Sequence, residues 1–240
     1  MIVLKLGGSV ITDKSSPETV DEAALDRVAG AVGEVGDSLI VVHGGGSFGH
    51  HHADRHGVSD REGTGSATAI RAIHAAMGRL NEAVVDALAA AGVPAVPVRP
   101  LSIASKTDDE LDVAVEPVRT LCAEGFVPVL HGDVVGHAGR GATIASGDTL
   151  VAALAPAVDA DRVGLCTGVP GVFDDDGRII EEITDPAAVG SLGESAATDV
   201  TGGMAAKVHT LAALDRPASI FGVDDLKGFL DGDSPGTTVR

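Results

Sequence analysis

The stretch LIVVHGGGSFGHHH, residues 39–52, decides how this chain is to be interpreted. Its first four residues form an apolar run of the length typical of a buried strand. Three consecutive glycines, Gly44–Gly46, follow after one histidine, and Gly49 completes a G-x-G-x-x-G pattern. Such a turn could belong to a dinucleotide fold, to a cradle for phosphate groups, or to a metal site built on the histidines around it.

Strands and helices alternate along the rest of the sequence. We expect strands at residues 2–6, 39–43, 93–98, 127–130, 162–167 and 218–221, and helices at residues 21–35, 67–91, 115–124, 148–154 and 203–214. The polar stretch at residues 132–141 is expected to form an inserted hairpin. This alternation predicts an α/β fold with a mainly parallel sheet covered by helices on both faces.

Length and composition limit the class of protein. The chain has 240 residues, 44% of them hydrophobic, which allows one sizeable core or two closely joined lobes; we expect a boundary near residues 156–160, where Pro156 ends a helix. No apolar run is long enough to span a membrane, and the N-terminus resembles a first strand more than a signal peptide. Cys122 and Cys166 lie too far apart for a metal motif. We therefore expect a cytoplasmic protein without a membrane partner.

The net charge is strongly negative, at −18, with 35 acidic against 17 basic residues. Nucleic acid would be repelled, so we expect no nucleic-acid partner. Salt screens the repulsion among carboxylates. A folded chain this acidic is therefore suited to concentrated salt, which predicts a halophilic source.

Two interpretations of the glycine turn have the weaker support. A dinucleotide fingerprint needs a second strand that ends in an acidic residue; Asp60 and Glu62 are at about the right distance but follow no apolar strand. A metal site could use His52 and His56, which share a helix face at a spacing of four. The glutamate of an H-E-x-x-H zinc motif is missing, because Ala53 follows His52.

A phosphate cradle has the stronger support. The bare N–H groups of consecutive glycines bind anions, and a helix that follows them adds the positive end of its dipole. Comparable turns occur at Gly7-Gly8-Ser9, after the first strand, and at Thr201-Gly202-Gly203, before the helix expected at residues 203–214. Three such turns suggest a ligand that carries several phosphates.

Lysines accompany these turns in a chain that has only five of them. Lys5 and Lys14 lie on either side of the first turn, and Lys207 lies one helical turn after the third. Taken singly, Lys5 could be a snorkelling lysine at a strand end and Lys14 a surface lysine. Together they suit phosphoryl transfer, in which a protein mainly positions the reactants and neutralises charge.

Four motifs resemble the amino acid kinase superfamily, and within it most closely the isopentenyl phosphate kinases. In chain order they are KLGGSVITDK, HGGGSFGH, GDVV…ATIASGDTL and TGGMAAK. The Gly49-His50 pair is similar to these kinases and to the related fosfomycin-resistance kinases. The resemblance covers essentially the whole chain. It implies an open αβα sandwich and usually a homodimer, with an acceptor-binding lobe at about residues 1–157 and an ATP-binding lobe at about 158–240.

The resemblance also implies roles for single residues. The ATP phosphates would be approached or held by Lys5, Gly7, Gly8, Ser9, Gly203 and Lys207. The acceptor would be contacted by Gly45, His50, Ser146 and Gly147, with His50 on its phosphate and Gly46 at the junction with ATP. Lys14 would stabilise the transition state, and Asp148 would orient the lysines. Thr167 would contact the nucleotide, although Gly168 and Pro170 replace the two acidic residues that the family often has in the motif T-D-V-D-G-V-Y.

The implied reaction phosphorylates isopentenyl phosphate with Mg-ATP, giving isopentenyl diphosphate for isoprenoid biosynthesis. The attacking phosphate oxygen is largely ionised near pH 7, because the second pKa of a phosphate monoester is about 6, so no strong general base is expected. Mg²⁺ would be held mostly by ATP oxygens and water, without a protein metal site. Two alternatives remain: a kinase of the same fold that acts on another small acid or phosphonate such as fosfomycin, and a non-catalytic protein that binds metal through its histidines.

Overall fold

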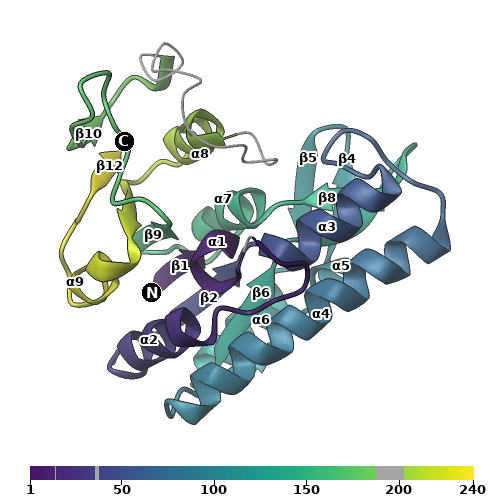
Figure 1. Ribbon diagram of the computed structural model, residues 1–240, viewed down its shortest axis with the longest axis horizontal. Coiled ribbons are helices and arrows are strands. Elements are labelled where there is room, and N and C mark those ends of the chain that lie inside the picture. The colour runs from purple at the N-terminus through teal and green to yellow at the C-terminus, as the bar shows by residue number, and fades with distance from the viewer. Residues whose placement is uncertain (14, 36–37, 188–202) are drawn as a thin grey trace.

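The computed structural model describes residues 1–13, 15–35, 38–187 and 203–240. Its centre is an eight-stranded sheet in the order β10-β12-β11-β9-β1-β2-β6-β3 (Figure 1). The strands are β1 (Ile2–Leu6), β2 (Leu39–His43), β3 (Ala95–Pro97), β6 (Val127–His131), β9 (Arg162–Thr167), β10 (Glu182–Ile183), β11 (Ala218–Gly222) and β12 (Thr237–Val239). β11 and β12 pair antiparallel, and the other neighbours pair in parallel.

Strand β1 shows why both faces of this sheet are buried. Ile2, Leu4 and Leu6 belong to one hydrophobic core, and Val3 belongs to the core on the other face. Successive side chains of a strand point to opposite faces. Lys5 therefore lies on the face of Val3, and what covers that face determines what the buried lysine contacts.

Helices cover both faces, so the chain folds as three layers, and the predicted α/β fold with a mainly parallel sheet is confirmed. The first core is covered by α1 (Gly8–Ile11), α2 (Glu22–Gly33), α3 (Gly46–His56), α4 (Ala67–Ala90) and α9 (Leu226–Leu230), and the second by α6 (Glu116–Ala123), α7 (Gly147–Ala157) and α8 (Gly203–Ala212). The described chain also has a short α5 (Pro100–Ile103) and a 3₁₀ turn η2 (Val223–Asp225).

A second, four-stranded sheet in the order β5-β4-β7-β8 lies near α3 and α4 (Figure 1). Its strands are β4 (Ala104–Thr107), β5 (Glu110–Val113), β7 (Asp133–His137) and β8 (Gly141–Ala145). The hairpin expected at residues 132–141 is therefore present as β7 and β8, but it extends to Ala145 and pairs with a β4–β5 hairpin that was not predicted.

Some boundaries differ from expectation. Helix α7 was expected to end before Pro156, but it includes that residue and ends at Ala157. A proline inside a helix removes one N–H bond, and here the helix ends one residue later, at Ala157. Strand β9 pairs with β1 in the same central sheet, so the division into lobes near residue 157 stays a prediction. Nowhere in the described ranges is there a helix long and apolar enough to cross a membrane.

Candidate active site

Two glycine turns meet backbone to backbone at the carboxyl ends of β1 and β2. The N–H of Gly44 donates to the carbonyl of Leu6 over 2.9 Å. A Cβ atom on Gly8 would lie 2.2 Å from the nitrogen of Gly46, and one on Gly44 would lie 2.7 Å from the nitrogen of Gly8. Only glycine allows this approach. The two turns predicted to bind phosphates are thus brought together. The first turn is also tied to β9, because the N–H of Gly7 donates to the carbonyl of Cys166 over 2.8 Å.

Helix α3 begins inside the second turn. Gly45 is its N-cap, and Gly46 has a φ of +48°, a left-handed conformation that favours glycine. A Cβ atom on Gly49 would lie 2.8 Å from the sulfur of Met77, so its absence lets α3 pack closely on α4. His50 lies half-buried in the second turn of this fixed helix, whose positive end points toward the glycines.

Three buried charges converge next to the turns. The Nζ atom of Lys5 donates to Oδ1 of Asp148 over 2.6 Å, and Nζ of Lys207 lies 3.7 Å from Oδ2 of the same carboxylate. The three residues are 5%, 8% and 7% exposed, in the order Lys5, Asp148, Lys207. Both ammonium groups are therefore held at one place, in a region where burial strengthens attraction to a phosphate. The structure therefore joins lysines from β1 and α8 through one carboxylate of α7.

The first residue of α7 packs closely against the side chain of Lys5. A Cβ atom on Gly147 would lie 3.3 Å from Cε of Lys5 and 3.4 Å from the carbonyl oxygen of His43. Ser146 is the N-cap, and its Oγ accepts from the N–H of Thr149 over 3.1 Å. The hydroxyl of Ser146 thus has a capping role, and its predicted contact with the acceptor stays a prediction.

The other predicted residues are distributed around this centre. Thr167 is 6% exposed, and its hydroxyl donates to the carbonyl of Val169 over 2.8 Å. This hydroxyl is therefore engaged within the fold, and its predicted contact with the nucleotide stays a prediction. Ser9 is exposed, and a Cβ atom on Gly168 would lie 3.4 Å from its Oγ. Gly203 begins α8 with a φ of +67°. Lys14, Thr201 and Gly202 fall outside the described residues.

The sequence of the chain was compared with the sequences of known protein families. Residues 1–216 match the Amino acid kinase family. The chain belongs to the amino acid kinase family.

Within this family, the chain is similar to isopentenyl phosphate kinases. The chain is 58% identical to the isopentenyl phosphate kinase of Haloferax volcanii over 100% of this chain and 98% of that protein. It is 36% identical to the isopentenyl phosphate kinase of Methanothermobacter thermautotrophicus over 89% of this chain and 86% of that protein. A crystal structure of isopentenyl phosphate kinase matches it with a TM-score of 0.87 at 29% identity, covering 100% of both chains. The family membership predicted from the four motifs is confirmed.

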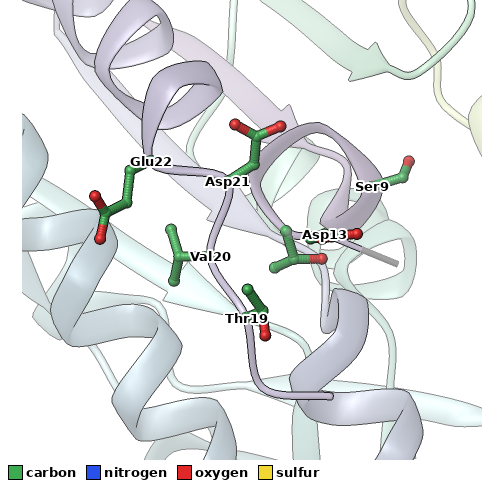
Figure 2. Close-up of a pocket in the computed structure, with 7 residues that line it drawn as sticks. Ser9, Asp13, Thr19, Val20, Asp21 and Glu22 are labelled. Atoms are coloured by element: carbon green, nitrogen blue, oxygen red, sulfur yellow. The ribbon is translucent and has the colours of Figure 1, made fainter. Parts of the chain in front are cut away.

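A cavity of about 580 Å³ opens on the α1–α2 side of this kinase-family site (Figure 2). It is lined by Ser9, Thr12, Asp13, Thr19, Val20, Asp21 and Glu22. Hydrogen bonds from the backbone and hydroxyl of Ser15 lower the pKa of Asp13. Three of the lining side chains are carboxylates, which repel a phosphate, although Ser9, predicted to approach the ATP phosphates, lines the same cavity. The sequence had not predicted this cavity.

Two buried histidines lie beneath the glycine turns, and neither was predicted. His43 ends β2, and its Nδ1 lies 3.1 Å from the carbonyl oxygen of Gly44; His131 ends β6, with the two ring centroids 5.5 Å apart. Burial lowers the pKa of each ring to about 4. Nδ2 of Asn81 lies 3.2 Å from Nε2 of His43, which ties α4 to the strand that carries the glycines.

The alternative interpretations of the glycine turn gain no support within the family fold. Residues 57–66, all of them described, contain only an isolated bridge at Thr64, so the second strand of a dinucleotide fold does not follow α3. His52 is paired with Glu18, its Nε2 lying 2.6 Å from Oε1. Across the described part of the chain, no three His, Cys, Asp or Glu side chains form a group able to hold a metal ion.

Proposed function

We propose that this protein transfers the γ-phosphoryl group of ATP to isopentenyl phosphate, forming isopentenyl diphosphate. The observation that carries the proposal is the convergence of Lys5, Asp148 and Lys207 beside two touching glycine turns. The full-length likeness to isopentenyl phosphate kinases supports the choice of acceptor.

The mechanism follows from positioning and charge. Lys5 and Lys207 lie where they can neutralise the phosphates of ATP, and Asp148 holds both ammonium groups in place. Donors fixed in advance around a developing charge lower the barrier because they need not reorganise during the reaction. The acceptor oxygen is already largely ionised at neutral pH, since its pKa is about 6. The site therefore needs no strong base, and we assign none.

The acceptor would lie on the side of α3. His50 would donate to its phosphate, and an apolar cluster begins two residues after this helix. Its buried members are Val58, Ile73, Val134 and Ala142, with Ile70 and Ile144 packed against them. These side chains pack against one another as core, so the choice of isopentenyl phosphate as acceptor rests on the likeness to isopentenyl phosphate kinases and not on this cluster.

Several further properties belong to the same proposal. Mg²⁺ would be held mainly by ATP oxygens and water, since this ion usually keeps several waters and Asp148 is engaged by two lysines. We also propose a cytoplasmic homodimer of halophilic origin, with the acceptor on residues 1–157 and ATP on residues 158–240. Light scattering coupled to size exclusion, in molar salt, would measure the assembly.

The deciding experiment is a panel of acceptors assayed with labelled ATP. We expect the highest kcat/KM for isopentenyl phosphate, above fosfomycin and above carboxylate acceptors such as acetylglutamate. A higher value for either rival class would replace the proposed acceptor.

The acceptor position can be tested separately through His50. A hydrogen bond to a charged group is worth about 1.5–3 kcal/mol, so His50→Ala should raise the KM for isopentenyl phosphate roughly 10–150-fold while leaving the KM for ATP nearly unchanged. His51→Ala, on the exposed side of the same helix, is the matched control. An unchanged acceptor KM in His50→Ala would remove this residue from the site.

A further inference from the structure

The loop between α1 and α2 is fixed to the first turn of α3 through one serine. The N–H of Ser47 donates to Oγ1 of Thr12 over 3.1 Å, and Oγ of Ser47 accepts from the N–H of Thr19 over 3.2 Å. The N–H of Glu18 donates to the carbonyl of Ser47 over 3.2 Å. In the sequence, this loop contains Lys14, the lysine predicted to stabilise the transition state.

Glu18 extends this contact to two helices. Its Oε1 lies 2.6 Å from Nε2 of His52 in α3, and its Oε2 accepts from Nε of Arg79 in α4 over 3.1 Å. Bonds to these two partners lower the pKa of the Glu18 carboxyl group, the bond to His52 contributing most. One carboxylate therefore joins the loop to α3 and to α4.

The backbone of Glu18 indicates that the side chain is needed. Its φ is +51°, a left-handed conformation that favours glycine and is unfavourable for glutamate. A turn without a further task would be better served by glycine. The ion pairs with His52 and Arg79 offset this conformation, which gives a physical reason for a glutamate at this position.

Glu18 contacts α3 on a different face from the one that carries the predicted acceptor site. His50 and His52 are two residues apart, which places them about 200° apart around the helix axis. The ion pair can therefore fix the rotation of α3 without using the position of His50.

We propose that Glu18 is a positioning residue of the phosphoryl transfer. It holds the backbone around Thr19 and Thr12 against α3 and α4, and so fixes these described parts of the loop relative to the glycine turn. This inference rests on the proposed kinase function. It assigns Glu18 no contact with either substrate, so its loss should lower kcat more than it raises either KM.

The test compares three variants. Glu18→Gln keeps the size and removes the charge, and Glu18→Gly relieves the backbone conformation but also removes the carboxylate. Glu82→Gln is the control, because Glu82 is an exposed carboxylate on α4. We expect kcat to fall at least tenfold in both Glu18 variants, with less than a threefold change in the two KM values and no change in Glu82→Gln.

A second readout separates positioning from general stability. Hydrogen–deuterium exchange of peptides from residues 12–20 should increase in Glu18→Gln, while peptides from the central strands keep the exchange of the parent. A variant with unchanged kcat, or with a kcat that falls only in proportion to a lower folded fraction, would overturn the proposal.

The acceptor panel keeps this result distinct from that of the proposed function. If the parent prefers another acceptor, the proposed function fails, and the Glu18 variants are then assayed with the preferred acceptor. If the parent phosphorylates no acceptor at all, both inferences fail together, whereas an active parent with fully active Glu18 variants overturns the positioning role alone.

Discussion

Asp148 is the residue on which the charge balance of the site depends. It is the carboxylate that meets both Lys5 and Lys207, and all three side chains are nearly buried. Removing one partner of a buried ion pair is strongly destabilising, because the remaining charge is left without compensation. Here two ammonium groups would lose their common partner.

We therefore predict that Asp148→Asn lowers both stability and kcat. Loss of one donor aimed at a developing charge typically reduces kcat by about 10²–10³-fold, and Asp148→Asn leaves two such donors without their common carboxylate. ATP should raise the melting temperature of the variant more than that of the parent, since its phosphates supply the negative charge that the lysines have lost. Thermal shift assays with and without Mg-ATP measure this difference.

A control separates this effect from a general loss of negative charge. Asp112→Asn removes an exposed carboxylate on β5 and should change neither kcat nor the response to ATP. If Asp148→Asn behaved in the same way, the three-charge cluster would have no catalytic role.

At the scale of elements, the start of α7 links stability to the site. The hydroxyl of Ser146 caps the helix, and the same helix presents Gly147 and Asp148 to Lys5. Replacing a serine cap by alanine costs about 1 kcal/mol. We predict that Ser146→Ala lowers the melting temperature, whereas Ser146→Asp, which also caps, largely preserves it.

The acceptor KM shows whether Ser146 has a second role. If the serine only caps the helix, both variants should keep the KM for isopentenyl phosphate within a few-fold of the parent. A KM that rises strongly in Ser146→Asp, where the cap is kept and a negative charge is added, would support the predicted contact with the acceptor phosphate.

The elements also show what the sequence could and could not predict. Strands β1, β2 and β9 are apolar runs followed by turns, and α4 repeats its apolar residues with helical periodicity. The bounds of these three strands and of this helix were therefore predicted nearly in full. The hairpin of β4 and β5 is short and partly exposed, and β12 has only three residues. Their places in the two sheets depend on β7 and β10, which are distant in sequence. Local pattern therefore gave no signal for them.

The same distinction holds at the site. Lys5 and Lys207 could be found because glycine turns stand next to them in the sequence. Glu18 and Arg79 could not, because they are separated by 61 positions and only the packing of α4 brings them together. The buried histidines His43 and His131 looked like ordinary strand ends.

For the whole molecule, the charge of −18 makes folding dependent on salt. Repulsion among carboxylates opposes the compact state and is screened by ions. We predict that the melting temperature rises markedly from low salt to molar potassium chloride. Thermal unfolding across this range is the measurement, and a constant melting temperature would contradict the inference of a halophilic origin without affecting the proposed reaction.

The pH dependence of stability should come in part from the buried rings of His43 and His131. Burial lowers the pKa of each to about 4 from the ordinary value of 6.5. Below pH 6.5 the unfolded chain therefore binds protons that the folded chain does not, so stability should fall as the pH decreases from 6.5 to about 4. Because the two rings lie side by side, protonation of one disfavours protonation of the other, and they should lose this stability together.

This last prediction is best measured in molar potassium chloride, where the repulsion among carboxylates is screened and does not obscure it. His131→Gln removes one titrating ring, so its unfolding free energy should decrease less steeply between pH 6.5 and 4 than that of the parent. His51→Gln, at an exposed position, should keep the slope of the parent. Equal slopes for all three proteins would show that the ring of His131 is not held neutral by the fold.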